Sequence, residues 1–379
     1  MATTALQRDA ERLALYTGLP HQSAHQIAGA TRRSAAVIPR PSPQQELLER
    51  WLFRRIAWPT YDPVRPWGIT WVRPGADGLT IRFEGDYMAV ELAGLLPPRL
   101  TADGEFYGIP GARFSPPSKK GVEMVLLGTS ARIRFAGIDP KAWRTAWTAE
   151  RQQAAKAGDV LCHLGSPHSW TDHERLYAAG AGVGRVSRSR HAEASAWLGS
   201  ALLRRVGLWS AAGIALSTTS WTNPDNGGEQ WIIDHIHQPT PGTLHHDELV
   251  HLLTDPEWGM QIKVEDRWCT CAYRGGMCLV KLRSTLGEAG ELELRFPRRE
   301  TPRSVQAYGP ELYAAKARAS ITVPARLRRL RCRGRGAGIA GPGQDAAGRS
   351  QGDRVAGRRL KAAPEDARER RAGRCWWRS

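Results

Sequence analysis

The residues best suited to chemistry are concentrated between Trp231 and Leu253, where five of the chain's eleven histidines lie. An even distribution would place only about half a histidine in the stretch from His235 to His251, which contains all five. Imidazole side chains bind transition metals and transfer protons near neutral pH. This segment is therefore the first candidate for a functional site.

A metal site is one interpretation of the cluster. Asp247 and His251 are four residues apart, which places them on one face of a helix, whereas His235 and His237 point to the same side of a strand. Together these four groups could hold Zn²⁺, Mn²⁺ or Mg²⁺. The zinc-protease motif is excluded because His246 and His251 are separated by five residues rather than four. The alternative interpretation is a capped helix start beside the polar face of a half-exposed strand.

A second interpretation combines the strand histidines with a later tyrosine. His235 and His237 flank one isoleucine, and Tyr313 is followed three residues later by Lys316. This order resembles that of the rolling-circle replication initiators and relaxases, over some 80 residues of the chain. The resemblance implies that the two histidines hold a divalent ion on a DNA phosphate, which Tyr313 attacks to form a 5′-phosphotyrosyl link. The sequence departs from the family in the residues that flank the histidine pair.

Three cysteines form a separate candidate site. Cys269, Cys271 and Cys278 lie close together, and with one nearby histidine they could bind zinc. Cysteines in a strand-turn-strand segment can instead be small apolar residues of a core. The six cysteines of the whole chain are too sparse for a disulfide scaffold, so we expect reduced thiols.

Arginines in two segments are candidates for contacts with nucleic acid. Arg185, Arg188 and Arg190 follow a glycine-rich stretch that lacks the residues of a phosphate-binding loop. Arg32 and Arg33 follow two short helical patterns around a turn, an arrangement that resembles a helix-turn-helix. The alternatives are a loop with solvated charges and a helical hairpin that packs on the next domain.

Most of the positive charge lies at the C-terminal end. The net charge is +17, and residues 326–379 hold 16 Lys and Arg against 5 Asp and Glu, which accounts for 11 of these charges. The segment is rich in Arg, Gly and Ala and has no helical or strand periodicity. It is either a disordered basic arm that binds phosphates or the product of a frameshift in a GC-rich gene. Codon-position GC content across the junction distinguishes these explanations.

Hydrophobic periodicity predicts an α+β fold. Period-two stretches at 67–74, 79–85, 122–128 and 131–137 and again at 260–266, 277–283 and 291–297 predict strands in mostly antiparallel sheets. Helical spacing covers 44–55, 139–157 and 191–206. We expect a helical hairpin and linker at 1–42, a first α+β domain at 43–158, a second at 159–325 and a disordered tail at 326–379.

The function that these features favour is that of a DNA-associated accessory protein, encoded by a plasmid or mobile element of a GC-rich bacterium. The alternatives are a metal-dependent DNA-nicking enzyme and a non-enzymatic module that binds another protein. No apolar run has the length of a signal peptide or a membrane span, so we expect a cytoplasmic protein with no membrane partner.

Overall fold

The computed structural model describes most of the chain before the basic tail. The described residues are 4–31, 36–57, 63–179, 193–223, 227–236, 243–270, 277–297, 310–319 and 323. They belong to one compact unit that extends from Met1 to Arg329. The predicted tail at 326–379 lies outside the described residues.

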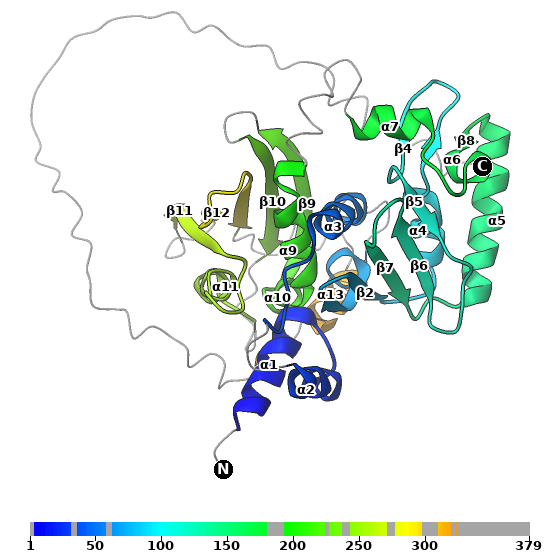
Figure 1. Ribbon diagram of the computed structural model, residues 1–379. Coiled ribbons are helices and arrows are strands. Elements are labelled where there is room, and N and C mark those ends of the chain that lie inside the picture. The colour runs from blue at the N-terminus through cyan, green and yellow to red at the C-terminus, as the bar shows by residue number, and fades with distance from the viewer. Residues whose placement is uncertain are drawn as a thin grey trace, which may run out of the picture. The chain divides into compact units, whose positions relative to one another are not determined.

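The fold is α+β, as the sequence predicts, with two five-stranded sheets (Figure 1). The first sheet has the order β1 (Ile69–Gly75), β2 (Gly78–Phe83), β7 (Arg132–Ala136), β6 (Val122–Leu126), β5 (Ala112–Phe114). The second has the order β11 (Ile262–Cys269), β12 (Met277–Ser284), β13 (Glu291–Pro297), β10 (Gly228–Ile236), β9 (Ile214–Asn223). Each contains one parallel pair, β2 with β7 and β10 with β13, and is otherwise antiparallel. A small third sheet pairs β4 (Phe106–Tyr107), β3 (Arg99–Leu100) and β8 (Val160–Leu161).

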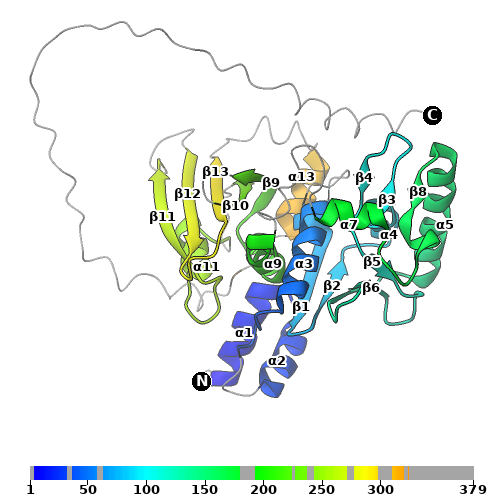
Figure 2. The same ribbon diagram turned by 45° about the horizontal axis from the view of Figure 1, so that its top comes forward.

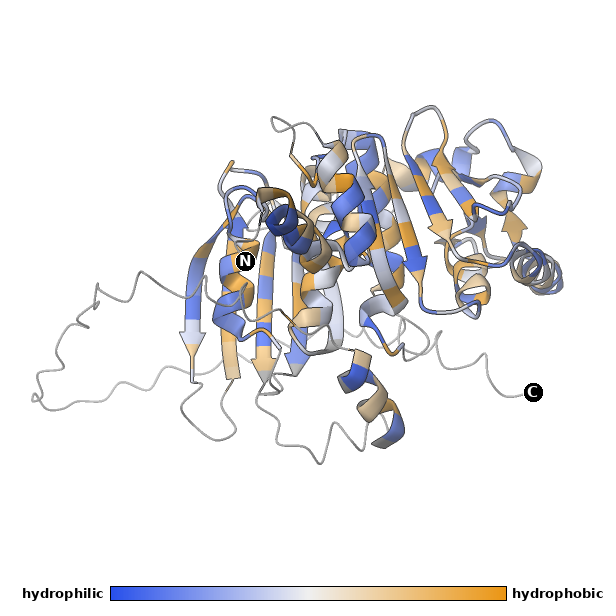
Figure 3. Cartoon of the chain, turned by 90° about the horizontal axis from the view of Figure 1, so that it is seen from below, coloured by the Kyte–Doolittle hydropathy of each residue, from blue (hydrophilic) through white to orange (hydrophobic). Residues whose placement is uncertain are grey.

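Alternation along the strands determines which face of each sheet is buried. In the first sheet Leu79, Ile81, Ile133 and Phe135 are buried, whereas the residues between them are partly or fully exposed. Figure 3 shows the resulting alternation of hydrophilic and hydrophobic residues along the strands. This pattern arises because successive side chains of a strand point to opposite faces.

Helices of the first half accompany the first sheet. They are α3 (Pro43–Ile56), α4 (Met88–Leu95) and α5 (Pro140–Ala157). The ends of α5 match the sequence prediction: the Asp139 carboxylate accepts hydrogen bonds from the first backbone N–H groups, and Gly158 ends the helix at a φ of 75°. Glycine suits this position because the left-handed backbone conformation is unfavourable for other residues.

The N-terminal helices form the predicted hairpin. The helix α1 (Ala5–Thr17) begins with a capping box between Thr4 and Gln7, and α2 (His21–Ala30) follows. The hairpin is packed against the rest of the unit, because the buried Tyr16 hydroxyl donates to the backbone oxygen of Leu252 at 2.7 Å. Among the described residues, no helix is long and apolar enough to cross a membrane.

Further helices lie in the second half, and the hydrophobic core runs between the two sheets. The helices are α6 (Cys162–Gly165), α7 (Asp172–Ala178), α9 (Ala196–Arg204), α10 (Val206–Ala211), α11 (His246–Leu253) and α13 (Pro310–Ala319). Figure 2 shows α7, α9, α11 and α13 from a second side. Phe53 of α3 contacts Trp67 edge-on and stacks on Trp231 of β10, with ring centroids 4.6 and 4.8 Å apart. The core is thus continuous across residue 158, and the boundary between two domains at this residue stays a prediction.

Candidate metal centre

One group of metal-binding side chains lies where α11 meets the edge of the second sheet. Cys269 and Cys278 are directly opposite each other in the antiparallel pair of β11 and β12, with their Sγ atoms 3.3 Å apart. The Nε2 atom of His246, the first residue of α11, lies 3.3 Å from the Cys269 Sγ. One ligand atom from each residue lies within 4.8 Å of the other two. We refer to these three residues as the Cys–His cluster.

The start of α11 determines the orientation of the His246 ring. His245 caps the helix: its Nδ1 accepts the backbone N–H of Asp247 at 3.3 Å, and its own backbone N–H donates to Glu248 at 2.8 Å. A ring nitrogen that accepts a backbone N–H carries a lone pair and no proton. The His246 Nδ1 lies only 2.8 Å from the His245 Nδ1, and in the tautomer that carries its proton on Nδ1 it donates to this nitrogen.

This assignment leaves the His246 Nε2 with a lone pair that faces the Cys269 thiol. A neutral imidazole with one nitrogen hydrogen-bonded to a neighbour and the other free to bind is the form that ligates metals. The Asp247 carboxylate lies 3.4 Å from the His246 Nδ1 and supports the same tautomer. His246, Cys269 and Cys278 therefore present one nitrogen and two sulfur atoms, which are the ligand types that zinc prefers.

A cation lies beside the cluster. Arg267 contacts Asp247 and interacts with Cys269. Burial lowers the pKa of Arg267, but the Asp247 carboxylate and the Cys269 thiolate outweigh burial and raise it. A guanidinium beside a cysteine favours the thiolate, which is the form of cysteine that binds metals.

The distances are close to those of a tetrahedral zinc site. Zn–S bonds of about 2.3 Å and Zn–N bonds of about 2.0 Å place tetrahedral ligand atoms about 3.5–3.8 Å apart. The separations of 3.3 Å between the Cys269 Sγ and its two neighbours differ from this by a few tenths of an ångström. Small side-chain rotations would open the space for an ion.

His235, one of the predicted strand ligands, lies in the core rather than in the cluster. It is 1% exposed, and its Nε2 lies 3.4 Å from the backbone oxygen of Trp209. Phe296 contacts the rings of both His235 and His246, at 6.3 and 5.6 Å between centroids. His235 thus shares a sheet face with the Cys–His cluster, but an aromatic ring stands between them.

Of the remaining predicted metal ligands, Asp247 lies beside the cluster, in a group with His245 and His246 that could also hold an ion. Asp247 forms an ion pair with Arg267, and His251 is exposed on α11. Among the described residues, neither group of three or more neighbouring metal-ligating side chains contains His235 or His251. His237 and Cys271 lie outside the described residues.

The predicted tyrosine and arginines cannot be placed at a site. Tyr313 belongs to α13, but its side chain lies outside the described residues, as do Arg32, Arg33, Arg185, Arg188 and Arg190. The predicted nicking site at His235, His237 and Tyr313 therefore stays a prediction.

His246 is the ligand that the sequence analysis did not single out. Its position at the start of a helix suggests a capping role, and its separation from Cys269 by 23 residues hides their contact. The useful signal was the hairpin: pairing the strands across the glycine turn places Cys269 opposite Cys278.

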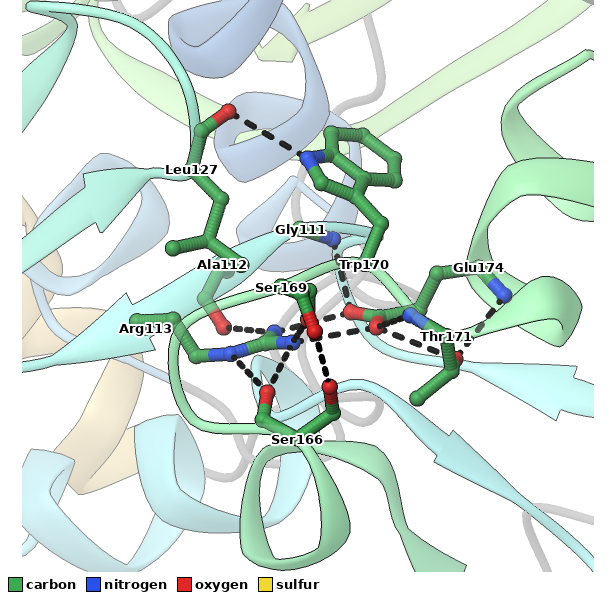
Figure 4. A network of polar contacts seen from close by, with 9 residues as sticks. All are labelled: Gly111, Ala112, Arg113, Leu127, Ser166, Ser169, Trp170, Thr171 and Glu174. Carbon is green, nitrogen blue, oxygen red and sulfur yellow. Dashed lines mark hydrogen bonds and ion pairs between the residues drawn. The ribbon is translucent and has the colours of Figure 1, made fainter.

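A second polar cluster surrounds Arg113 and has a structural role (Figure 4). The Arg113 guanidinium donates to both oxygens of Glu174 and to the backbone oxygens of Ser166 and Ser169. Glu174 also accepts the backbone N–H groups of Gly111 and Thr171. The donors of Arg113 and the oxygens of Glu174 form hydrogen bonds with each other and with the backbone, so few are left to bind a ligand. These bonds hold the segment around α6 and α7 against β5.

The burial of His163, in this segment, leads us to expect that the stability of the folded chain falls in acid. Its ring nitrogens are buried without hydrogen-bond partners, and the ring packs on Trp147 at 4.9 Å. Burial, with the cations Arg113 and Arg151, lowers the pKa of His163 to about 4. The unfolded chain takes up a proton below pH 6.5 but the folded chain does not, so stability present above pH 6.5 is lost as the pH falls toward 4.

The wild type should lose stability when the pH falls from 7 to 4.5, and we expect His163→Leu to reduce this loss by about 2 kcal/mol. Urea unfolding at the two pH values measures the free energy of unfolding. The exposed His173→Gln on α7 is the control and should leave the loss unchanged. Equal pH dependence in the wild type and His163→Leu would contradict the assignment.

No known protein family, curated protein or solved structure matches this chain. The assignment of the Cys–His cluster therefore depends on its own atoms: two cysteine sulfurs, one imidazole nitrogen and a neighbouring guanidinium.

Proposed function

We propose that this protein binds zinc through His246, Cys269 and Cys278 and that the ion has a structural role. The observation that carries the proposal is the convergence of one imidazole nitrogen and two sulfurs from three separate elements. A tetrahedral site needs a fourth ligand, and Asp247, which groups with His246, is one candidate, whereas Cys271 lies outside the described residues.

The edge of the second sheet explains why a metal would be useful there. After the buried Ile262, every residue of β11 is exposed, so hydrophobic burial contributes little to holding this strand. A bulge between Val264 and Asp266 also interrupts its pairing with β12. A zinc ion shared by β11, β12 and α11 would fasten both the strand and the helix, since the free energy of binding becomes free energy of folding.

Metal content tests the proposal. We expect about one zinc per chain in the full-length protein purified without chelators, and at least tenfold less in Cys269→Ser and Cys278→Ser. Cys162→Ser is the matched control, because Cys162 is the remaining free cysteine among the described residues and lies in α6. Far-ultraviolet circular dichroism would verify that each variant folds.

Two results would overturn the zinc site. One is equal zinc in the wild type and in both serine variants. The other is a wild type without zinc in which peptide mapping finds a disulfide between Cys269 and Cys278.

As a second candidate function, we propose that the protein is a cytoplasmic DNA-associated accessory protein, of the kind that plasmids or mobile elements of GC-rich bacteria encode. The net charge of +17 supports this proposal, and so do the exposed arginines on the first sheet. Reduced thiols in the Cys–His cluster fit a cytoplasmic location.

Salt dependence tests the DNA proposal. The full chain should bind DNA at 50 mM salt and lose at least about tenfold in affinity by 200 mM, because phosphate contacts release counterions. Absence of binding to both single-stranded and duplex DNA at 50 mM salt would end it.

A further inference from the structure

The exposed face of the first sheet carries a group of arginines that the proposed metal site does not use. Arg73 of β1, Arg82 of β2, and Arg132 and Arg134 of β7 alternate with buried residues on their strands. They therefore share one face, which we call the arginine face. Arg73, Arg82 and Arg132 are exposed, and Arg134 is partly exposed.

The strand register places these arginines near one another. Arg73 is opposite Thr80, which is in turn opposite Arg134, so one row across three strands holds two of the cations. Arg82 lies two residues beyond Thr80 on the same strand and is therefore the diagonal neighbour of both Arg73 and Arg134. Diagonal neighbours on adjacent strands are about 7–8 Å apart. Arg132 lies two residues before Arg134 on the same strand.

Acidic side chains leave this charge largely uncompensated. Glu123 of β6 pairs with Arg134 at 3.1 Å. Within the described part of the chain, Arg73, Arg82 and Arg132 have no salt-bridge partner. The second sheet differs, since Arg283 pairs with Glu265 and Glu291, and Arg295 pairs with Glu293. Positive charge thus accumulates on one sheet and is balanced on the other.

An aromatic ring lies among these charges. Trp71 is opposite Arg82 on the arginine face and is partly exposed, and the Arg73 guanidinium lies 5.9 Å from the centre of its ring. Sites for single-stranded nucleic acid combine cations that contact phosphates with aromatic rings on which bases stack.

We infer that the arginine face binds single-stranded nucleic acid, with Arg73, Arg82, Arg132 and Arg134 on phosphates and Trp71 beneath a base. The inference rests on the proposed association with DNA and assigns it a surface. Duplex reading is disfavoured by size: a five-stranded sheet is about 19 Å wide, whereas the major groove is about 12 Å wide. A single strand can lie across the exposed rows without entering a groove.

The experiment compares two double variants of the full chain. Arg73→Gln with Arg82→Gln removes two positive charges from the arginine face, and Arg144→Gln with Arg151→Gln removes two from the exposed surface of α5. Binding of a labelled 20-nucleotide oligo(dT), oligo(U) and a 20-base-pair duplex is measured by fluorescence anisotropy from 50 to 200 mM salt. The two oligonucleotides distinguish DNA from RNA as the natural strand.

We expect the arginine-face variant to bind single strands about tenfold more weakly at 150 mM salt, with a salt slope reduced by about 1 to 1.5, since each lost contact removes about 0.7. The α5 variant should bind like the wild type. Equal binding by the two variants would overturn the arginine face while leaving DNA association intact, and a wild type that prefers the duplex would overturn the single-strand assignment. A wild type that binds none of the three probes would refute the DNA proposal itself.

Discussion

Replacing Glu49 with Gln is expected to lower the free energy of unfolding by about 3–5 kcal/mol, a large part of the stability of an ordinary domain. The Glu49 carboxylate is completely buried and accepts four hydrogen bonds of 2.7 Å: two from Arg204, one from Ser200 and one from Gln45. The neutral amide would leave the Arg204 cation buried without a counter-charge and would turn an N–H group toward one of these donors.

A matched control separates burial from charge. Glu123→Gln removes the same charge from a partly exposed pair with Arg134, which should cost about 0–1 kcal/mol. Urea unfolding of both variants at pH 7 gives the comparison. If the two substitutions cost the same, the buried pair contributes no more than a surface pair and our account of the contact between α3 and α9 is wrong.

The contact also bears on how the chain is organised. Glu49 and Arg204 are 155 residues apart and lie on opposite sides of the predicted boundary at residue 158. Arg50 and Glu229, also buried, form a second ion pair across it. Periodicity reveals which face of each helix is apolar. It does not reveal that Glu49 of α3 pairs with Arg204 of α9, or that Arg50 of α3 pairs with Glu229 of β10. These partners are specified by packing at long range.

The strands and the longest helix were predictable for a local reason. Alternating burial along β2, β6 and β7, and the Asp139 and Gly158 ends of α5, are properties of short stretches of sequence. The alternation of side chains along a strand also explains why the prediction at the candidate site was only partly correct. The stretch around His235 was recognised as a strand, but alternation gives a side chain's face and not what covers it, and Trp209 and Phe296 enclose His235.

Predicting the Cys–His cluster from the sequence would have required two pieces of information that no local pattern contains. The register of β11 on β12 places Cys269 opposite Cys278, and the docking of α11 brings His246 to them. The thiols were identified from the sequence as one interpretation, while the imidazole that joins them was attributed to a helix start. Two neighbouring residues divide these purposes, since His245 provides the cap and the His246 ring turns toward the thiols.

The ion pair of Arg113 and Glu174 is expected to make the second large contribution to the free energy of unfolding, and this contribution depends on pH. Burial alone would raise the pKa of the Glu174 carboxyl, but the hydrogen bonds from Arg113, Thr171 and Gly111 lower it below its ordinary value of 4.5. A carboxyl whose pKa is lower in the folded chain contributes stability above its unfolded pKa and loses it as the pH falls through the folded pKa. We therefore expect the contribution of Glu174 to be complete above about pH 5 and to decline below 4.5.

Glu174→Gln should cost about 3 kcal/mol or more at pH 7, because the buried Arg113 loses its counter-charge and the amide cannot accept every donor that now meets the carboxylate. Urea unfolding at pH 7, 5 and 3.5 should show the difference between wild type and variant narrowing as the pH falls. Asp172→Asn on the same helix is the control, since that carboxylate is 88% exposed and pairs only with the exposed Arg175. A difference that stays constant from pH 7 to 3.5 would mean that Glu174 acts through its shape rather than through its charge, and the ion pair would then not be what holds α7 against β5.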